Sequence, residues 1–275
     1  MDETGRRVWV PAHVERIISL APNLTEIVYA LGLEARLVGV TNLCNFPPAA
    51  RTKPRVGDVL NPSVERIVEL RPDLVLGTTA GNRRATVEAL EHVGLPLYGI
   101  NPRSVENIFT SIQHVAELAG VPHAGEKLVA RLRARLGTLE ARLRKTRAPR
   151  VLFVLWLEPL ITVGNDTFLN DVLQRARADS ITAHLALAWP RLSVEEVIER
   201  NPGYLVFPRT ESIQKRWARL AGEAPWRQLE ATRHDRIVWL DEAILRPGPR
   251  IVEALEELAR ALHPDAFHLR EVAEK

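Results

Sequence analysis

The sequence is short of the residues that build disulfides and metal centres. Among its 275 residues there is one cysteine, Cys44, which excludes an intramolecular disulfide and any site built from several cysteines. The eight histidines lack the paired spacing of metal ligands, and the HExxH zinc motif is missing. We therefore expect no metal ion and no cofactor held by the protein, and we interpret Cys44 as a small loop residue.

Long apolar runs are also missing. No stretch approaches the roughly 20 apolar residues that a membrane-spanning helix needs. The N-terminus, MDETGRRVWVPAHVERIISLA, has no apolar core of the kind that a secretory signal requires. Two interpretations stay open: the chain remains in the cytosol, or it acts outside the cytosol and its leader is absent from this sequence.

Motifs for nucleotide and hydrolase chemistry are absent too. The sequence contains no Walker loop, no glycine fingerprint for dinucleotides and no GxSxG nucleophile elbow. The net charge is only +3, and acidic and basic residues alternate along the expected helices, which argues against a nucleic-acid groove. What remains for function is an internal repeat, a set of loop aromatics and one charged cluster.

The repeat is the most informative of these. Residues 63–75 read SVERIVELRPDLV and residues 193–205 read SVEEVIERNPGYL, so each residue pairs with the one 130 positions later. The serine, the valine after it, two glutamates and the proline are identical in both copies. This period is far too long for the unit of a solenoid. It predicts two similar lobes.

Each copy has the pattern of a capped helix followed by a buried strand. Ser193 can cap the helix, Glu196 completes a capping box, and Pro202 ends the helix. Glu65 and Glu195 fall in the first turns of the two helices, where the helix dipole favours an anion. The spacing by itself fits a stabilising role at the helix starts and leaves a functional role open.

Strand and helix patterns alternate in both halves, which predicts parallel sheets with right-handed crossovers. Ligands of such sheets bind beyond the carboxyl ends of the strands, so the loops at 21–25, 41–48, 57–62 and 78–82 should share one edge. Segment 177–189 has no clear assignment, and the tail from Pro264 is expected to fray. We expect strands at 16–20, 37–40, 74–76, 97–100, 150–156, 204–207 and 237–240, and helices at 26–31, 83–93, 104–119, 168–175, 210–220 and 251–262.

A longer helix is predicted over 124–144, after Pro122. Its leucine stripe fits a coiled coil, but its place between the two repeat-bearing halves favours a connector spanning about 30 Å at 1.5 Å per residue. We therefore predict the α/β class, with two Rossmann-like lobes that contain central parallel sheets and are joined by a single long rigid α-helix. The predicted bounds are 1–120 for the N-terminal lobe, 121–147 for the connecting helix and 148–275 for the C-terminal lobe. The stripe comprises Leu128, Leu132, Leu136, Leu139 and Leu143.

Loop aromatics and one charged cluster are the candidate ligand contacts. Phe46, Trp156 and Trp189 stand at strand ends or in loops; each could be half-buried packing, or several could together form a stacking surface for a flat ligand. The charged cluster surrounds a Pro-Gly-Pro turn. It could brace that turn by local ion pairs or orient the amides or carboxylates of a ligand. Its members are Asp241, Glu242, Arg246 and Arg250.

Taken together, these segments resemble the substrate-binding proteins of ABC importers for cobalamin and iron–siderophores, and most closely the cobalamin-binding proteins. The resemblance covers nearly the whole chain, from about Arg16 to Leu262, in family order. It rests on RIISLAPNLTEIVYALG, VTNLCNFPP, SVERIVELRPDLVL, WLEPLITVG, WPRLSVEEVIERNP and LRPGPRIVEALEEL.

The resemblance implies two α/β lobes joined by one rigid helix, with the ligand held between them and only a small closure. It also implies that Glu65 and Glu195, one in each lobe, dock onto arginines of the two transmembrane permease subunits. Two matched carboxylates suit a two-fold-related partner surface. The partners expected are this permease dimer and a small-molecule ligand, with no nucleic acid, and we expect a monomer. The implied location is periplasmic or extracytoplasmic and membrane-associated, with a cytoplasmic location left open.

The resemblance also implies ligand-binding residues. Trp189 and Arg246 match cleft residues of the cobalamin-binding relatives, and Glu242 stands where a cleft aspartate is expected. Several cleft positions that are aromatic in the best-known cobalamin binder are not aromatic here, although Trp156 and Phe46 could compensate. The full expected set is Pro22, Leu43, Phe46, Val59, Thr78, Trp156, Ile161, Trp189, Glu242 and Arg246.

The expected function is therefore a non-enzymatic carrier that binds cobalamin or a related corrinoid and delivers it to a membrane importer. A ferric siderophore or haem on the same fold stays open as the cargo. The three tyrosines lie inside expected helices or strands, which argues against haem bound through a tyrosine. A third interpretation, suggested by the missing leader, is a cytosolic corrinoid-handling protein.

Overall fold

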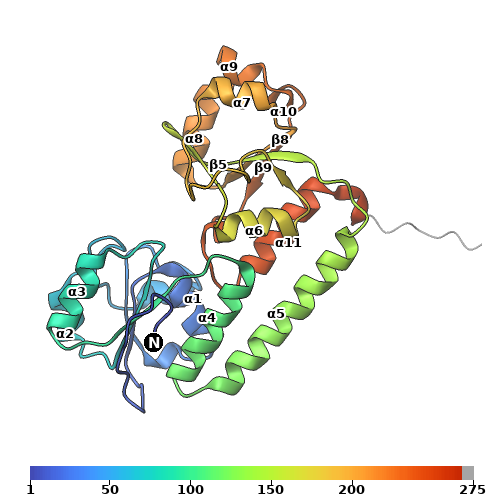
Figure 1. The fold of residues 1–275 in the computed structure, drawn as a ribbon. Coiled ribbons are helices and arrows are strands. Elements are labelled where there is room, and N and C mark those ends of the chain that lie inside the picture. Colours follow the sequence, from blue (N-terminus) through green and yellow to red (C-terminus); the bar gives the residue numbers. More distant parts are fainter. Residues whose placement is uncertain (268–275) are drawn as a thin grey trace, which may run out of the picture. The chain divides into compact units, whose positions relative to one another are not determined.

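The computed structural model describes residues 1–267 and divides the chain into two compact units (Figure 1). The first comprises 1–102, 106–133 and 247–249, and the second comprises 103–105, 134–246 and the chain from 250 onward. Both have a sheet with helices packed on it, and strands and helices alternate along the chain. The predicted α/β class is therefore confirmed.

The first unit contains a four-stranded parallel sheet in the order β2-β1-β3-β4. Strand β1 lies between its two neighbours, with Ile17 opposite both Leu37 of β2 and Leu74 of β3. All strands run in one direction, so their carboxyl ends meet at one edge, as predicted. The bounds are β1 Ile17–Ser19, β2 Leu37–Val40, β3 Leu74–Thr78 and β4 Leu97–Ile100.

Helices cover both faces of this sheet. On one face Ile18 and Val75 pack with Ile67 of α2 and Leu90 of α3 in a buried cluster, and Figure 1 shows α1 and α4 on the other side. Burying both faces explains why the strands are mainly apolar. The helical bounds are α1 Pro22–Ala30, η1 Glu34–Arg36, η2 Pro48–Thr52, α2 Val64–Glu69, α3 Arg84–His92 and α4 Val105–Leu118.

The N-terminal segment covers the open edge of β4, which the sequence did not predict. The Glu3 amide donates to the Gly99 carbonyl (3.1 Å), and the Asp2 carboxylate accepts from the Gly99 amide (3.2 Å). Asp2 is 5% exposed and pairs with Arg6 at 2.5 Å. The segment therefore satisfies backbone groups that an edge strand would otherwise leave open.

The second unit repeats this plan. Strands β5, β7, β8 and β9 are parallel, and Val151 of β5 stands opposite Tyr204 of β8. Strand β6 adds an antiparallel hairpin partner to β5 at the edge of this sheet. The bounds are β5 Arg150–Leu157, β6 Leu160–Thr162, β7 Asp179–Ser180, β8 Tyr204–Pro208 and β9 Ile237–Leu240.

One face of this sheet packs on aromatic side chains of α8 and α9. Phe207 lies 4.9 Å from both Trp217 and Trp239 between ring centroids, and Trp217 meets Trp226 edge-on. Figure 1 shows α6 and α11 on the other face. The bounds are α6 Phe168–Arg175, α7 Val194–Arg200, α8 Glu211–Leu220, α9 Ala224–Arg227, α10 Glu230–Arg233, η3 Glu242–Leu245, α11 Ile251–Leu262 and η4 Pro264–Ala266.

Helix α5, Pro122–Leu143, is continuous for 22 residues. Its first part, to Arg133, belongs to the first unit and the rest belongs to the second. The predicted leucine stripe is buried along the whole helix, with exposures of 0–5%. The predicted helix linking two α/β lobes is thus present, and apolar packing on one stripe stabilises it.

Local predictions were accurate where capping chemistry was explicit. Ser193 and Glu196 form the predicted capping box, whereas Ser63 caps its helix alone because Arg66 occupies the equivalent position. The unassigned segment contains strand β7, held by the amide of Ile181 on the carbonyl of Val151. Pro264–Ala266 forms a 3-10 turn instead of fraying, and residues 268–275 of the predicted tail lie outside the described residues.

Candidate functional site

In the first unit, the carboxyl edge of the sheet carries the four loops that the sequence predicts there. Asn82 holds three of them together. Its side chain accepts from the Thr78 amide (2.8 Å) and donates to the carbonyls of Leu20 (3.1 Å) and Val59 (2.8 Å). The fourth loop joins through the Asn42 amide, which donates to the Gly57 carbonyl at 2.9 Å. The loops therefore form one connected surface.

The 41–48 loop is built on Cys44. The thiol is fully buried, within 3.1 Å of the Thr25 hydroxyl and 3.2 Å of the Thr41 hydroxyl. Burying this small side chain turns two larger apolar ones outward: Leu43 is 62% exposed and Phe46 is 39% exposed. Exposed apolar side chains at a strand's carboxyl edge suit contact with a ligand.

Three other predicted contact residues of this unit are less accessible. Pro22 is half-buried at the first position of α1. Val59 is half-buried against Gly81, where an added Cβ would overlap it. Thr78 is 4% exposed and its hydroxyl accepts from the Ala80 amide at 3.3 Å. Thr78 therefore shapes its loop, and only Pro22 and Val59 keep partly open surface.

In the second unit, three predicted contact residues share a face of the β5–β6 hairpin. Trp156 stands opposite Ile161, and Ile161 stands opposite Arg191 in an antiparallel bridge. Backbone hydrogen bonds from Thr162 to Pro190 and from Gly164 to Ala188, both 3.0 Å, continue that register. Opposed residues and alternate residues project to the same face. Trp156, Ile161 and Trp189 thus lie on one face, and Trp189 is 47% exposed.

Trp156 already has a cationic neighbour. The guanidinium carbon of Arg216, on α8, lies 4.9 Å from its ring centroid. Glu158 fixes Arg216 at 3.1 Å and also pairs with Arg219, while its own carbonyl accepts from the Trp156 indole at 2.9 Å. A cation over an indole face is attractive by about 0.5–2 kcal/mol. The arrangement orients both the ring and the charge.

The charged cluster beyond β9 forms the local ion pairs considered from the sequence. Arg246 pairs with Glu242 at 2.5 Å, and Arg250 lies 3.3 Å from Asp241. The Arg246 side chain is 11% exposed, whereas that of Glu242 is 40% exposed. These pairs brace the turn, and the more exposed carboxylates can still accept hydrogen bonds.

The repeated glutamates are free at the surface. Glu65 and Glu195 occupy the second positions of α2 and α7, and both are exposed. Among residues 1–267 neither carboxylate has a hydrogen bond or ion pair. The capping work is done instead by Ser63, Ser193 and Glu196. Capping of the two helices therefore does not use Glu65 or Glu195, and both carboxylates are available to a partner.

The three tyrosines are remote from the carboxyl edges of the strands. Tyr29 is near the end of α1, and Tyr204 begins β8 at the opposite edge of its sheet. Tyr98 is 5% exposed inside β4, and its burial, together with nearby Glu3 and Asp2, raises the pKa of its phenol above the usual value. No described tyrosine is thus placed beside the predicted contact residues of its own unit.

Within residues 1–267, no helix combines the length and apolar character needed to cross a membrane. Over the same residues, no group of three or more His, Cys, Asp or Glu side chains is arranged to hold a metal ion.

Two residues that matter to these surfaces were missed from the sequence. Asn82 ends the loop after a predicted strand and belongs to no recognised motif. An asparagine in such a loop is nevertheless a sign that its side chain hydrogen-bonds to backbone groups nearby. Arg216 sits on a polar helix stripe 60 residues from Trp156, so no local spacing could have connected them. Both depend on contacts that only the fold creates.

Comparison with known proteins identifies the family. Residues 17–244 match the family model described as periplasmic binding protein. The chain is 32% identical over 247 residues to the vitamin B12-binding protein of Vibrio parahaemolyticus, covering 89% of this chain and 88% of that protein. It is 28% identical over 277 residues to an uncharacterized ABC transporter substrate-binding lipoprotein, YvrC, of Bacillus subtilis, covering 97% and 85%.

A solved structure is also similar to this chain over most of its length. The periplasmic haem-binding protein RhuT from Roseiflexus sp. RS-1, in apo form, superposes with a TM-score of 0.83 at 29% identity, covering 92% of this chain and 99% of that one. These matches confirm the resemblance found in the sequence, and they imply a membrane permease and a small-molecule ligand as partners. The chain therefore belongs to the periplasmic binding protein family, whose members are substrate-binding components of ABC transporters and not enzymes.

Proposed function

We propose that this protein binds a corrinoid, cobalamin in particular, and delivers it to the permease of an ABC importer. The relative from Vibrio parahaemolyticus, which carries the name vitamin B12-binding protein, supports this cargo. The observation that carries the proposal is the single face formed by Trp156, Ile161 and Trp189. A broad apolar face of this kind suits a large, flat macrocycle.

Polar groups beside the apolar surfaces would orient the ligand. A corrin ring carries amide side chains around its rim, which need both donors and acceptors. Arg246 and Glu242 supply both in the second unit. We propose ten contact residues, five in each unit: Pro22, Leu43, Phe46, Val59 and Thr78 in the first, and Trp156, Ile161, Trp189, Glu242 and Arg246 in the second.

Delivery would use the two repeated glutamates. Glu65 and Glu195 are chemically equivalent, exposed and without partners among the described residues. Matched carboxylates suit a permease made of two subunits that each offer a cationic site. We propose that the protein works outside the cytosol as a monomer, with one glutamate docking on each subunit.

Haem is the second candidate cargo, because the haem-binding protein RhuT is similar in fold and sequence. The cation of Arg216 near Trp156 could pair with a haem propionate. Against haem, the three tyrosines are remote from the proposed contact residues of their own units. Corrinoid binding needs no ligand bond from the protein to the metal, so it fits the available side chains better.

The absorbance of purified protein tests the choice between these cargoes. Protein produced in a corrinoid-fed host should retain a compound with the visible bands of a corrinoid, at close to one equivalent per chain. A Soret band and extracted haem would reject the corrinoid and favour haem. A matched preparation in which Trp156 and Trp189 are both alanine should lose the retained corrinoid.

A further inference from the structure

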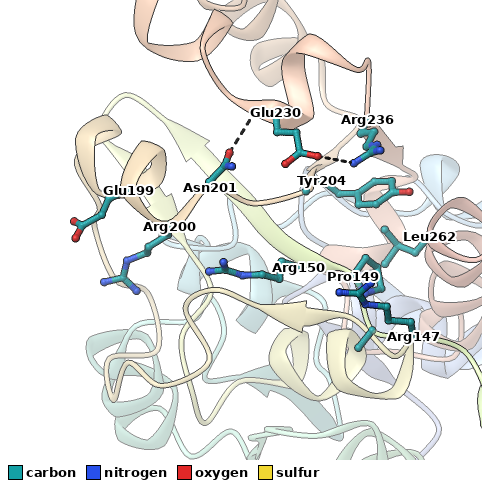
Figure 2. A pocket seen from close by; sticks show the side chains of 12 residues that line it. Arg147, Pro149, Arg150, Glu199, Arg200, Asn201, Tyr204, Glu230, Arg236 and Leu262 are labelled. Carbon is teal, nitrogen blue, oxygen red and sulfur yellow. Dashed lines mark hydrogen bonds and ion pairs between the residues drawn. The ribbon is translucent and has the colours of Figure 1, made fainter.

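A cavity of about 570 Å³ opens at the amino edge of the second unit's sheet, away from the strand ends that carry Trp156. It lies where β5 and β8 begin (Figure 2). Its charge is mainly positive, because four arginines and two glutamates line it. The arginines are Arg147, Arg150, Arg200 and Arg236, and the glutamates are Glu199 and Glu230.

Only some of these charged side chains have hydrogen-bond or ion-pair partners. Glu230 pairs with Arg236 at 3.2 Å, and Arg200 donates to the Ile181 carbonyl at 3.0 Å. Among residues 1–267, the guanidinium groups of Arg147 and Arg150 have no hydrogen bond or ion pair. In Figure 2 the Arg150 side chain extends across the cavity and the Glu199 carboxylate points away from it. Two cations without counterions therefore face one hollow.

In the first unit, the arginine equivalent to Arg150 has hydrogen-bond partners. Leu74 and Tyr204 are equivalent by the 130-residue repeat, and they stand opposite Ile17 and Val151. Arg16 and Arg150, which precede those residues, are therefore equivalent. The Arg16 guanidinium donates to the carbonyls of Leu70 (2.6 Å) and Arg71 (3.0 Å) at the end of α2.

The same comparison shows a position where the first unit has a carboxylate and the second unit has none. In the first unit, the Asp73 carboxylate accepts from the amides of Glu15 (2.8 Å) and Arg16 (2.9 Å). The repeat places Gly203 at the position equivalent to Asp73 in the second unit. The Gly203 amide donates to the Arg150 carbonyl (2.9 Å), just as the Asp73 amide donates to the Arg16 carbonyl (2.8 Å). A Cβ added to Gly203 would meet only the Arg150 carbonyl, at 3.5 Å. The backbone path is kept, but the carboxylate is replaced by open space. Pro149 stands at the position of Glu15 and has no N–H, so only the Arg16 amide has an equivalent donor, that of Arg150.

We propose that this cavity binds a phosphate-bearing anion, whose phosphate takes the place that the Asp73 carboxylate fills in the first unit. Arg147 and Arg150 supply charge-assisted hydrogen bonds, which phosphate accepts on several oxygens at once. The cavity is larger than a phosphate group, so there is room for the ester attached to it. The site does not depend on the cargo proposed above.

Titration with inorganic phosphate tests the site. The amide resonances of Asn201 and Gly203 should shift and saturate with sodium phosphate, and not with sodium chloride at equal ionic strength. Arg147→Gln with Arg150→Gln should weaken binding at least about tenfold, because both charged donors are lost. Arg147→Gln alone should weaken phosphate binding less than the double variant does, and it tests the site if the double variant does not fold.

A matched variant controls for net charge. Lys127→Gln with Arg131→Gln removes two exposed charges from the first unit, on α5, and should leave phosphate binding unchanged. Vesicles with and without phosphatidylglycerol distinguish the source of the phosphate. Sedimentation only with phosphatidylglycerol, reversed by phosphate, identifies a lipid headgroup, whereas phosphate binding without sedimentation identifies a soluble ester. The proposal would be overturned if the Arg147→Gln, Arg150→Gln variant bound phosphate as tightly as the wild type, or if the wild type bound in neither assay.

Discussion

Arg216 stacks over Trp156, with its guanidinium carbon 4.9 Å from the ring centroid. The ring is thus held in a fixed orientation before any ligand is present, by a cation on one side and a hydrogen bond from its indole nitrogen to Glu158. Fixed aromatic rings lose little conformational entropy on binding. This pair therefore gives the proposed corrinoid surface of the second unit a ring in a defined orientation.

Trp189→Ala should weaken corrinoid binding by about 2 kcal/mol, roughly thirtyfold, because large aromatic anchors dominate binding surfaces. Calorimetric titration with cyanocobalamin measures the change. Trp9→Ala is the control, since Trp9 is 90% exposed and lies outside the proposed contact residues. Equal affinities for the wild type and Trp189→Ala would remove Trp189 from the site.

Glu65→Ala combined with Glu195→Ala should leave ligand affinity unchanged and reduce importer-dependent uptake at least about tenfold, because two charged docking contacts are lost. Uptake of labelled cyanocobalamin into vesicles containing the cognate permease measures this. Glu117→Ala with Glu223→Ala removes one exposed carboxylate from each unit and should transport normally. Full transport by the Glu65 and Glu195 variant would reject the docking role.

Asn82→Ala should destabilise the first unit by about 2 kcal/mol, since three partly buried hydrogen bonds are lost. It should also weaken ligand binding, because the loops carrying Val59 and Thr78 lose their common tie. Asn42→Ala removes one exposed bond to Asp58 and should cost less than about 0.5 kcal/mol. Denaturant unfolding compares the two, and equal losses would show that Asn82 is not the central tie.

Gly164→Ala should destabilise the second unit by about 2 kcal/mol or more, because the added Cβ overlaps the Leu187 carbonyl oxygen. The displaced segment leads directly to Trp189, so corrinoid binding should weaken as well. Gly137→Ala is the matched comparison: Gly137 is exposed within α5 with open space around it, and alanine there should stabilise by about 0.5–1 kcal/mol. Thermal unfolding of both variants checks the opposite signs.

Asp2→Asn should lower stability by about 1–2 kcal/mol at neutral pH. Burial disfavours the Asp2 carboxylate, but hydrogen bonds from Thr4 and Arg6 outweigh burial, so its pKa lies below 3.8 in the folded protein. A carboxyl with a lowered folded-state pKa stabilises above its unfolded pKa and loses that effect as the pH falls through the folded value.

The stability difference between wild type and Asp2→Asn should therefore be constant from pH 5 to 7 and shrink below about pH 4. Urea unfolding at several pH values measures it. Asp235→Asn is the control, because Asp235 is exposed at a positive φ of 52° that asparagine also accepts. A difference that persists undiminished at pH 2.5 would contradict the assignment.

Local chemistry explains which parts of the fold were predictable. Ser193 and Glu196, the proline stops and the leucine stripe of α5 each act within a few residues, so the sequence pattern indicates them directly. The strand at 237–240 and the helix at 251–262 were placed with their observed bounds for the same reason. The cover of β4 by Asp2 was not predictable, since it joins residues 97 apart.

The candidate site divides along the same line. The positions of Glu65 and Glu195 in the first turns of two helices followed from the repeat, and the loop position of Phe46 followed from the sequence pattern. The burial of Thr78 and the covering of Trp156 by Arg216 depend on packing across the chain. The cavity at Arg150 was not predictable from the sequence, because its lining residues come from separate segments that only the fold brings together.

Calorimetric titration of the wild-type protein with cyanocobalamin, haemin and a ferric siderophore decides whether this family member carries a corrinoid. We expect saturable binding of one cyanocobalamin per chain, at least about a hundredfold tighter than either competitor. Tighter binding of haemin or of the siderophore, with no heat from cyanocobalamin, would contradict it.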